Sequence, residues 1–138
     1  MVSGQLASKN MDSGEKFYLG GAGGVRAYPS SEAGGSEGAM LNLELRFKVL
    51  ADVQLAALYD AGIVRVNRNN DFTGAAAKNS LSLHGAGLAL AWAGPGASSI
   101  KAVWSHRLGS NPNPTASGRD QDGSLLRHRI WLTASISL

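Results

Sequence analysis

Hydrophobic and polar positions alternate one by one over several stretches of the chain. The clearest stretch is 40–48, where one side of the predicted strand carries Leu41, Leu43, Leu45 and Phe47. The residues between them are polar or charged. Successive side chains of a β-strand point to opposite faces, whereas a helix would scatter these apolar residues around its circumference. The pattern therefore predicts a strand with one apolar face.

The same alternation returns in later stretches, and the connections between them differ in length. These stretches are 55–63, 86–92, 100–104 and 130–138. The connections are alternately short and long, namely 51–52, 67–79, 94–97 and 109–123. This rhythm is typical of a transmembrane β-barrel, which has brief periplasmic turns and extended extracellular loops. A soluble antiparallel sandwich with one solvated face explains the alternation equally well but leaves the loop lengths unexplained.

Composition narrows the class of protein further. The chain has 18 glycines in 138 residues, well above the usual ~7%, which favours an all-β chain. It contains no cysteine, which excludes disulfides and thiolate metal sites. A net charge of +3 without long runs of like charge argues against a nucleic-acid partner. No apolar run approaches the ~20 residues of a spanning helix, so any crossing of a membrane must be made by strands.

Glycines are concentrated in residues 20–28, GGAGGVRAY. A dinucleotide-binding loop needs Gly-x-Gly-x-x-Gly at the start of a helix. Aligning Gly21 and Gly23 puts Arg26 where the third glycine belongs, and Pro29 discourages a helix. No Lys-Ser or Lys-Thr pair follows, so a Walker loop is excluded as well. Nucleotide binding is therefore not expected.

The tetrad Val25, Arg26, Ala27 and Tyr28 resembles the Val-Arg-Gly-Tyr motif in the inward-folded sixth loop of outer-membrane transporters that move polypeptides. Further similarities to the two-partner secretion branch (haemolysin secretion/activation) lie in 4–8, 13–21, 58–62, 85–88 and 131–138. The resemblance implies an all-β fold in which residues 1–138 form the C-terminal part of a transmembrane β-barrel, about six antiparallel strands with an inward-folding loop. It also implies that the periplasmic domains and N-terminal strands of such a transporter lie outside this segment.

The resemblance implies a function as well. A complete transporter of this family is a pore in the bacterial outer membrane that secretes a large partner exoprotein, of the haemolysin or adhesin type, without nucleotide hydrolysis. Its expected partners are that exoprotein, the outer-membrane lipid and the barrel assembly machinery, and no cofactor is expected. Two alternatives stay open, a barrel-assembly relative of the same superfamily and a soluble β-sandwich binding module. No nucleophile with its base can be located, so an enzyme is not expected.

In the family the loop arginine binds a carboxylate on the inner barrel wall, which implies a salt bridge between Arg26 and Asp60. The alternation supports this pairing, because Asp60 falls opposite the apolar, outward set of its own strand. Glu44, on the polar side of the neighbouring strand, is expected as a second acceptor of the planar guanidinium. The glycines that would let the loop backbone pass close to the wall are Gly20, Gly21, Gly23 and Gly24.

Two positions depart from the family pattern. Ala27 replaces the glycine of the tetrad, which costs about 1 kcal/mol if the site needs a positive φ. Leu138 replaces the terminal aromatic residue of the final strand. Together with Ile136, Leu138 forms the expected C-terminal assembly signal.

Histidines and tryptophans recur on the predicted strands. Three histidines at a spacing of 22 residues share the outward face of successive strands: His84, His106 and His128. We expect them to mark the polar–apolar border of the membrane surface rather than to bind a metal. Trp92 and Trp104 also face outward, as in an interfacial girdle, whereas Trp131 points to the lumen or to the loop. A mixed-charge interior is expected from the inward positions Lys48, Lys101, Arg107 and Arg129.

Overall fold

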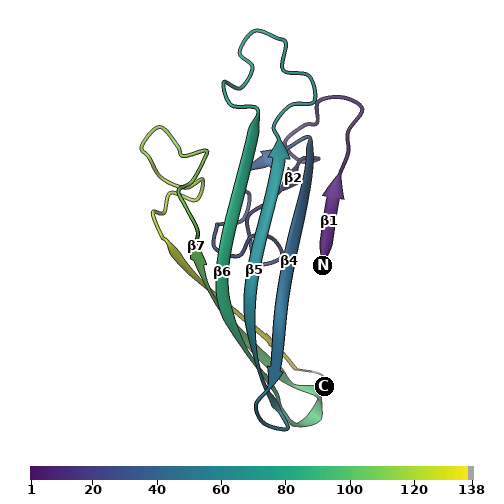
Figure 1. The fold of residues 1–138 in the computed structure, drawn as a ribbon, viewed down its shortest axis with the longest axis vertical. Helices are drawn as coiled ribbons and strands as arrows, with labels where there is room; N and C mark the ends of the chain where they lie inside the picture. The colour runs from purple at the N-terminus through teal and green to yellow at the C-terminus, as the bar shows by residue number, and fades with distance from the viewer. Residues whose placement is uncertain (137–138) are drawn as a thin grey trace.

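The chain folds into one antiparallel sheet of six strands and a separate two-stranded sheet (Figure 1). The computed structural model describes residues 1–136. The strands of the large sheet, in spatial order, are β1 (Val2–Gln5), β4 (Glu37–Lys48), β5 (Val53–Arg65), β6 (Ser80–Ala93), β7 (Ser99–Arg107) and β8 (His128–Ser135). The small sheet pairs β2 (Phe17–Tyr18) with β3 (Gly34–Gly35). The prediction of an all-β chain with about six antiparallel strands is confirmed.

Helical structure is limited to one short 3-10 turn, η1 (Pro95–Ala97), among the residues that the structure describes. None of the helical structure in residues 1–136 is long and apolar enough to cross a membrane.

The pairing of the strands follows the alternation in the sequence. In β4, Leu43 and Leu45 are exposed on one face, whereas Asn42 is buried on the other. Asn42 pairs directly with Asp60 of β5, which is also buried. The sheet therefore has an apolar outer face and an inner face that carries polar groups.

The inner face of β4 to β6 is covered by the connection between β1 and β4, residues 6–36, which we call the inner loop (Figure 1). This loop contains β2 and β3. Its residues 19–28 pack against the wall at the ends of β5 and β6 that lie next to the long loops. The tetrad is therefore positioned on the inner side of the sheet.

β6 is longer than the predicted 86–92, and its first half reverses the apolar pattern. The strand begins at Ser80. Leu81 and Leu83 are buried on the inner face, whereas Leu88 and Leu90 further along are exposed on the outer face. The reversal has a physical reason, because the first half of β6 is the part that the inner loop covers. A search for one continuous alternation misses such a strand.

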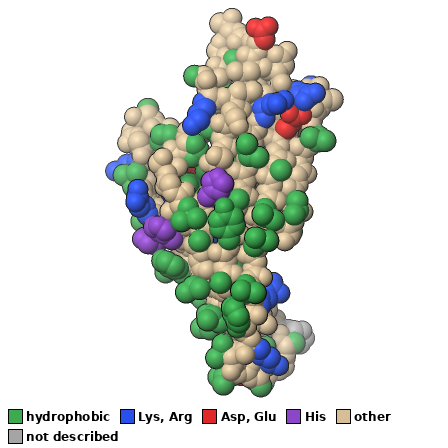
Figure 2. Space-filling view, in the orientation of Figure 1, with side chains coloured by type: hydrophobic (Ala, Val, Ile, Leu, Met, Phe, Trp, Pro, Cys, Tyr) green, Lys and Arg blue, Asp and Glu red, His purple; other side chains and the backbone are tan. Residues whose placement is uncertain are grey.

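Large apolar side chains cover the outer face of the sheet (Figure 2). Leu45 is 63% exposed, and Leu132 of β8 is 72% exposed. Trp92 and Trp104 also lie on this face and are 38% and 43% exposed. Such an apolar surface is expected of a barrel wall that faces lipid. In residues 1–136 no second large sheet packs on this face, as a soluble sandwich would require.

The connections keep the alternation of short and long that the sequence predicts. The short ones, 49–52 and 94–98, lie at one end of the sheet, and the long ones, 66–79 and 108–127, lie towards the other (Figure 1). The first turn begins at residue 49 rather than at the predicted 51. In an outer-membrane barrel the long loops mark the extracellular end.

Candidate functional site

An apolar cluster fixes the inner loop to the wall. Leu19, Val25 and Tyr28 of the loop are almost completely buried. They belong to one cluster with Val64 of β5 and Leu83 of β6. Burying each large apolar side chain is worth roughly 1.5–3 kcal/mol. The loop therefore rests on the wall instead of standing free in the interior.

Glycines let the loop backbone make this close approach. A Cβ at Gly24 would collide with the carbonyl oxygen of Leu19, and one at Gly20 would collide with another backbone carbonyl of the loop. Gly21 has a φ of 119°, which side chains other than glycine rarely adopt. A Cβ at Gly23 would meet nothing within 4 Å, so this position does not require glycine.

The Arg26 guanidinium lies between two carboxylates of the wall. Its Nε and Nη2 donate to Oδ2 and Oδ1 of Asp60 at 2.8 and 2.7 Å. Its Nη1 donates to Oε1 of Glu44 at 2.6 Å. The backbone N–H of Arg26 also donates to Asp60, at 3.1 Å. Arg26 is only 6% exposed and Asp60 only 2%, so the bidentate pair is shielded from water.

Two further side chains complete this arrangement. The Asn42 amide donates to Oδ1 of Asp60 at 2.8 Å and to the carbonyl oxygen of Gly24 at 2.9 Å. The Trp131 indole N–H donates to the carbonyl oxygen of Arg26 at 2.8 Å. Trp131 therefore contacts the loop, one of the two locations expected from its alternation. Asn42 was not among the residues predicted to hold the loop, although it belongs to the polar set of the 40–48 strand. We call Arg26, Asp60, Glu44, Asn42 and Trp131 the loop anchor.

Glu44 connects the loop anchor to the open interior. Its second oxygen accepts a hydrogen bond from Nε of Arg46 at 2.9 Å. The ammonium group of Lys101 lies 3.5 Å from its first oxygen. The side chains of Arg46 and Lys101 are 60% and 42% exposed, so both cations remain accessible on the inner face.

Tyr28 links the inner loop to the long 108–127 loop. The Arg107 guanidinium lies over the Tyr28 ring, 4.3 Å from its centre, in a cation–π contact. Arg107 also forms a buried ion pair with Asp120 of the long loop. The backbone N–H of Gln121 donates to Glu32 of the inner loop at 3.0 Å. The long loop is therefore folded onto the inner loop.

Burial of Asp120 by itself raises the pKa of its carboxyl. Hydrogen bonds from Arg107 and Asn111 outweigh this effect and lower the pKa below its ordinary value of 3.8. Asp120 therefore stays ionised at neutral pH and keeps the charge that Arg107 needs as a partner.

Ala27 carries no backbone strain. Ala27 does not have a positive φ. The cost of about 1 kcal/mol that a positive φ would impose on an alanine therefore does not arise. Its side chain faces Gly85 of β6, where an added Cβ would lie 2.7 Å from the Cβ of Ala27. The methyl group of Ala27, which a glycine at this position of the tetrad would lack, therefore occupies the space beside Gly85, where the wall has no side chain.

The other candidate residues are not part of the loop anchor. Ile136 is 76% exposed, and Leu138 lies outside the described residues, so the C-terminal assembly signal stays a prediction. His106 and His128 lie side by side on β7 and β8 with their Nδ1 atoms 3.2 Å apart. His84 instead faces Tyr59, with Nδ1 3.4 Å from the phenolic oxygen. No group of three or more His, Asp or Glu side chains in residues 1–136 is arranged to hold a metal ion.

This arrangement holds the inner loop on the wall through charged contacts. The guanidinium stays charged at every physiological pH, so its attachment depends on the carboxylates and not on its own titration. The groups of the loop anchor form no set of nucleophile, base and oxyanion donors. Its chemistry is therefore positioning rather than bond formation.

Comparisons with known proteins agree with this description. A family model described as the Omp85 superfamily domain matches residues 1–119. The chain is 27% identical over 136 residues to the heme/hemopexin transporter protein HuxB of Haemophilus influenzae strain Rd, and 28% identical to that of strain 86-028NP. Each match covers 96% of this chain but only 22% of the relative, so the chain spans about a fifth of the length of these proteins. No solved structure matches the chain.

Proposed function

We propose that residues 1–138 form the C-terminal segment of a barrel that exports a partner protein by two-partner secretion. The chain belongs to the Omp85 superfamily. Members of the superfamily reside in the bacterial outer membrane and act as transporters rather than enzymes. The exported partner is a large exoprotein of the haemolysin or adhesin type. Export proceeds through the barrel without nucleotide hydrolysis.

The observation that carries the proposal is the loop anchor. Three nitrogen atoms of the Arg26 side chain donate to two wall carboxylates, and the backbone of the same residue donates to one of them. A bidentate guanidinium contact sets orientation as well as position. A loop held in this way on the inner wall can define the path of a transported chain, and that path changes if the loop moves.

The edges of the sheet support the assignment as a segment of a barrel. β1 and β8 are the edge strands of the large sheet. In hydrocarbon an unpaired edge leaves backbone N–H and C=O groups without partners, so barrels that span membranes are closed. In the complete transporter, β1 and β8 therefore pair with strands that lie outside this segment.

The inner face supports the transport of an unfolded polypeptide. Arg46 and Lys101 stay accessible beside the loop anchor, and Glu44 places a carboxylate between them. A wall of mixed charge offers hydrogen bonds and weak ion pairs to a passing chain without a deep apolar surface that would retain it.

The proposal is tested by removing each half of the salt bridge from the complete transporter. Arg26→Ala and Asp60→Ala are both expected to abolish secretion of the partner. Arg26→Ala leaves the buried Asp60 carboxylate without a cation, and Asp60→Ala removes the bidentate partner of Arg26 and leaves it only Glu44. The secreted partner is measured in the culture medium. Insertion of the barrel is checked separately by its heat-modifiable migration in gels.

Arg119→Ala is the matched control, because it removes an arginine from the exposed part of the long loop. It is expected to leave secretion unchanged. Normal export by both Arg26→Ala and Asp60→Ala would refute the role of the loop anchor. Loss of other outer-membrane barrels from cells with either variant, with export unaffected, would favour a role in barrel assembly instead.

A further inference from the structure

We propose that the outer face of the sheet binds a phosphorylated, acylated glycolipid of the outer leaflet, of the lipid A type. The site lies on the face opposite to the loop anchor and is independent of secretion. It combines an apolar groove across β4 and β5 with a pair of arginines at the extracellular end of the same strands.

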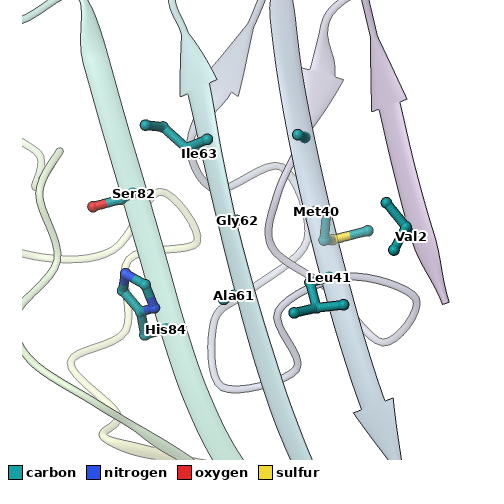
Figure 3. Close-up of a pocket in the computed structure, with 9 residues that line it drawn as sticks. Val2, Met40, Leu41, Ala61, Gly62, Ile63, Ser82 and His84 are labelled. Carbon is teal, nitrogen blue, oxygen red and sulfur yellow. The ribbon is translucent and has the colours of Figure 1, made fainter.

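The groove has a volume of about 330 Å³ and an almost entirely apolar lining. Ala39 of β4 and Ala61 of β5 line it with small side chains. The larger side chains of Leu41 and Ile63 stand on either side of Ala61 (Figure 3). Two alanines between larger apolar side chains therefore leave a shallow hollow on a surface that otherwise carries projecting side chains.

Two arginines stand at the extracellular end of this face, held by one carboxylate. Nη1 of Arg65 donates to Oε2 of Glu37 at 3.2 Å, and Nη1 of Arg68 donates to Oε1 at 3.0 Å. The Glu37 side chain is only 12% exposed, whereas those of Arg65 and Arg68 are 52% and 49% exposed. Glu37 therefore fixes two guanidinium groups close together and leaves a net positive charge towards the solvent.

The arginine pair and the groove form one continuous surface. A second hollow of about 290 Å³ is lined by Ala39 and Ile63, which also line the groove, and by Glu37 and Arg65. Ala61 and Arg65 are separated by four positions along β5, about 13 Å at ~3.3 Å per residue. Figure 2 shows charged side chains of both signs above the apolar side chains of this face.

The order of these features fits a lipid of the outer leaflet. Arg65 ends β5 and adjoins the long 66–79 loop, which marks the extracellular end. A headgroup at the arginines therefore sits at the extracellular surface, and its alkyl chains run down the groove into the bilayer. Guanidinium groups bind phosphate in a bidentate manner, and basic pockets of membrane proteins bind anionic headgroups. Two guanidinium groups held by one carboxylate match a single phosphate group of such a headgroup.

The test uses the complete transporter, purified in detergent and stripped of lipid. It is titrated with bisphosphorylated lipid A, with dephosphorylated lipid A and with phosphatidylglycerol. Bound lipid is counted by native mass spectrometry, and the unfolding temperature is measured in parallel. Bisphosphorylated lipid A is expected to bind most tightly and to raise the unfolding temperature.

Two variants separate the headgroup contact from the alkyl contact. Arg65→Gln combined with Arg68→Gln, and separately Ala61→Phe, are each expected to weaken binding of lipid A by about tenfold or more. Lys78→Gln is the control, because it removes a positive charge from the same end of the molecule without touching the groove. Binding by either variant as tight as that of the control would overturn the proposal. Equal affinity for dephosphorylated lipid A or for phosphatidylglycerol would also overturn it.

Discussion

The Asp60 carboxylate is the residue on which the loop anchor depends most. It accepts two hydrogen bonds from the Arg26 side chain, one from the Arg26 backbone and one from Asn42. Removing one partner of a buried ion pair typically costs 3–5 kcal/mol, because the remaining charge stays buried. The alternation along β5 was enough to place Asp60 on the inner wall. It could not identify Asn42 as a partner, because that contact depends on the pairing of Asn42 with Asp60 across two strands.

Gly85 of β6 faces the methyl group of Ala27, and substitutions can test this contact. Gly85→Ala is expected to lower the unfolding temperature of the complete barrel, because overpacking of this kind costs about 1–3 kcal/mol. Adding Ala27→Gly to this variant should restore most of the stability. The temperature at which heat-modifiable migration is lost measures both effects.

Gly23→Ala is the matched control for this experiment, since a Cβ there meets nothing within 4 Å. It should leave the unfolding temperature close to that of the unmodified protein. A double variant no more stable than Gly85→Ala alone would show that the wall glycine does not accommodate Ala27.

The strands and the loops differ in how far the sequence determines them. β4 and β5 could be predicted because their outward residues are apolar over the whole of the predicted length. The first half of β6 could not, because Leu81 and Leu83 are apolar on the inner face where the inner loop covers them. β2 and β3 have only two residues each, too few for a periodic signal. The folding of the 108–127 loop onto the inner loop depends on contacts between Arg107, Asp120 and Tyr28, which are distant in sequence.

The docking of the 108–127 loop is expected to depend on pH through Asp120. The folded pKa of this carboxyl lies below its ordinary value of 3.8, so the docked loop binds fewer protons than the released loop. Its stabilising effect is therefore complete above pH ~4 and is lost as the pH falls through the lower, folded pKa. Limited proteolysis of the loop at decreasing pH should show cleavage only in that acidic range.

Asp120→Asn should make the same loop susceptible to protease at neutral pH, because Arg107 then lacks its counterion, at a cost of about 3 kcal/mol. Asp71→Asn, in the other long loop, serves as the control and should not change cleavage of the 108–127 loop. Equal protection of the loop in the Asp120→Asn variant and in the control would contradict this role of Asp120.

The molecule as a whole uses the two faces of one sheet for two purposes. The inner face holds the loop anchor, and Arg46 and Lys101 stay accessible beside it. The outer face is apolar, as a wall in contact with lipid requires. Both faces need the other strands of a closed barrel, since β1 and β8 are edges of the sheet. The location in the outer membrane follows from membership of the superfamily, whereas secretion of a partner is a proposal about the complete protein.

The central claim is that Arg26 holds the inner loop to the barrel wall through Asp60. The most direct measurement is a structure of the complete transporter in a lipid nanodisc by electron cryo-microscopy, at a resolution that shows side chains. We predict that the Arg26 guanidinium donates two hydrogen bonds to the Asp60 carboxylate, as in the distances of 2.8 and 2.7 Å found here. A resting structure in which this guanidinium faces solvent, with Asp60 bound to another cation, would contradict the account.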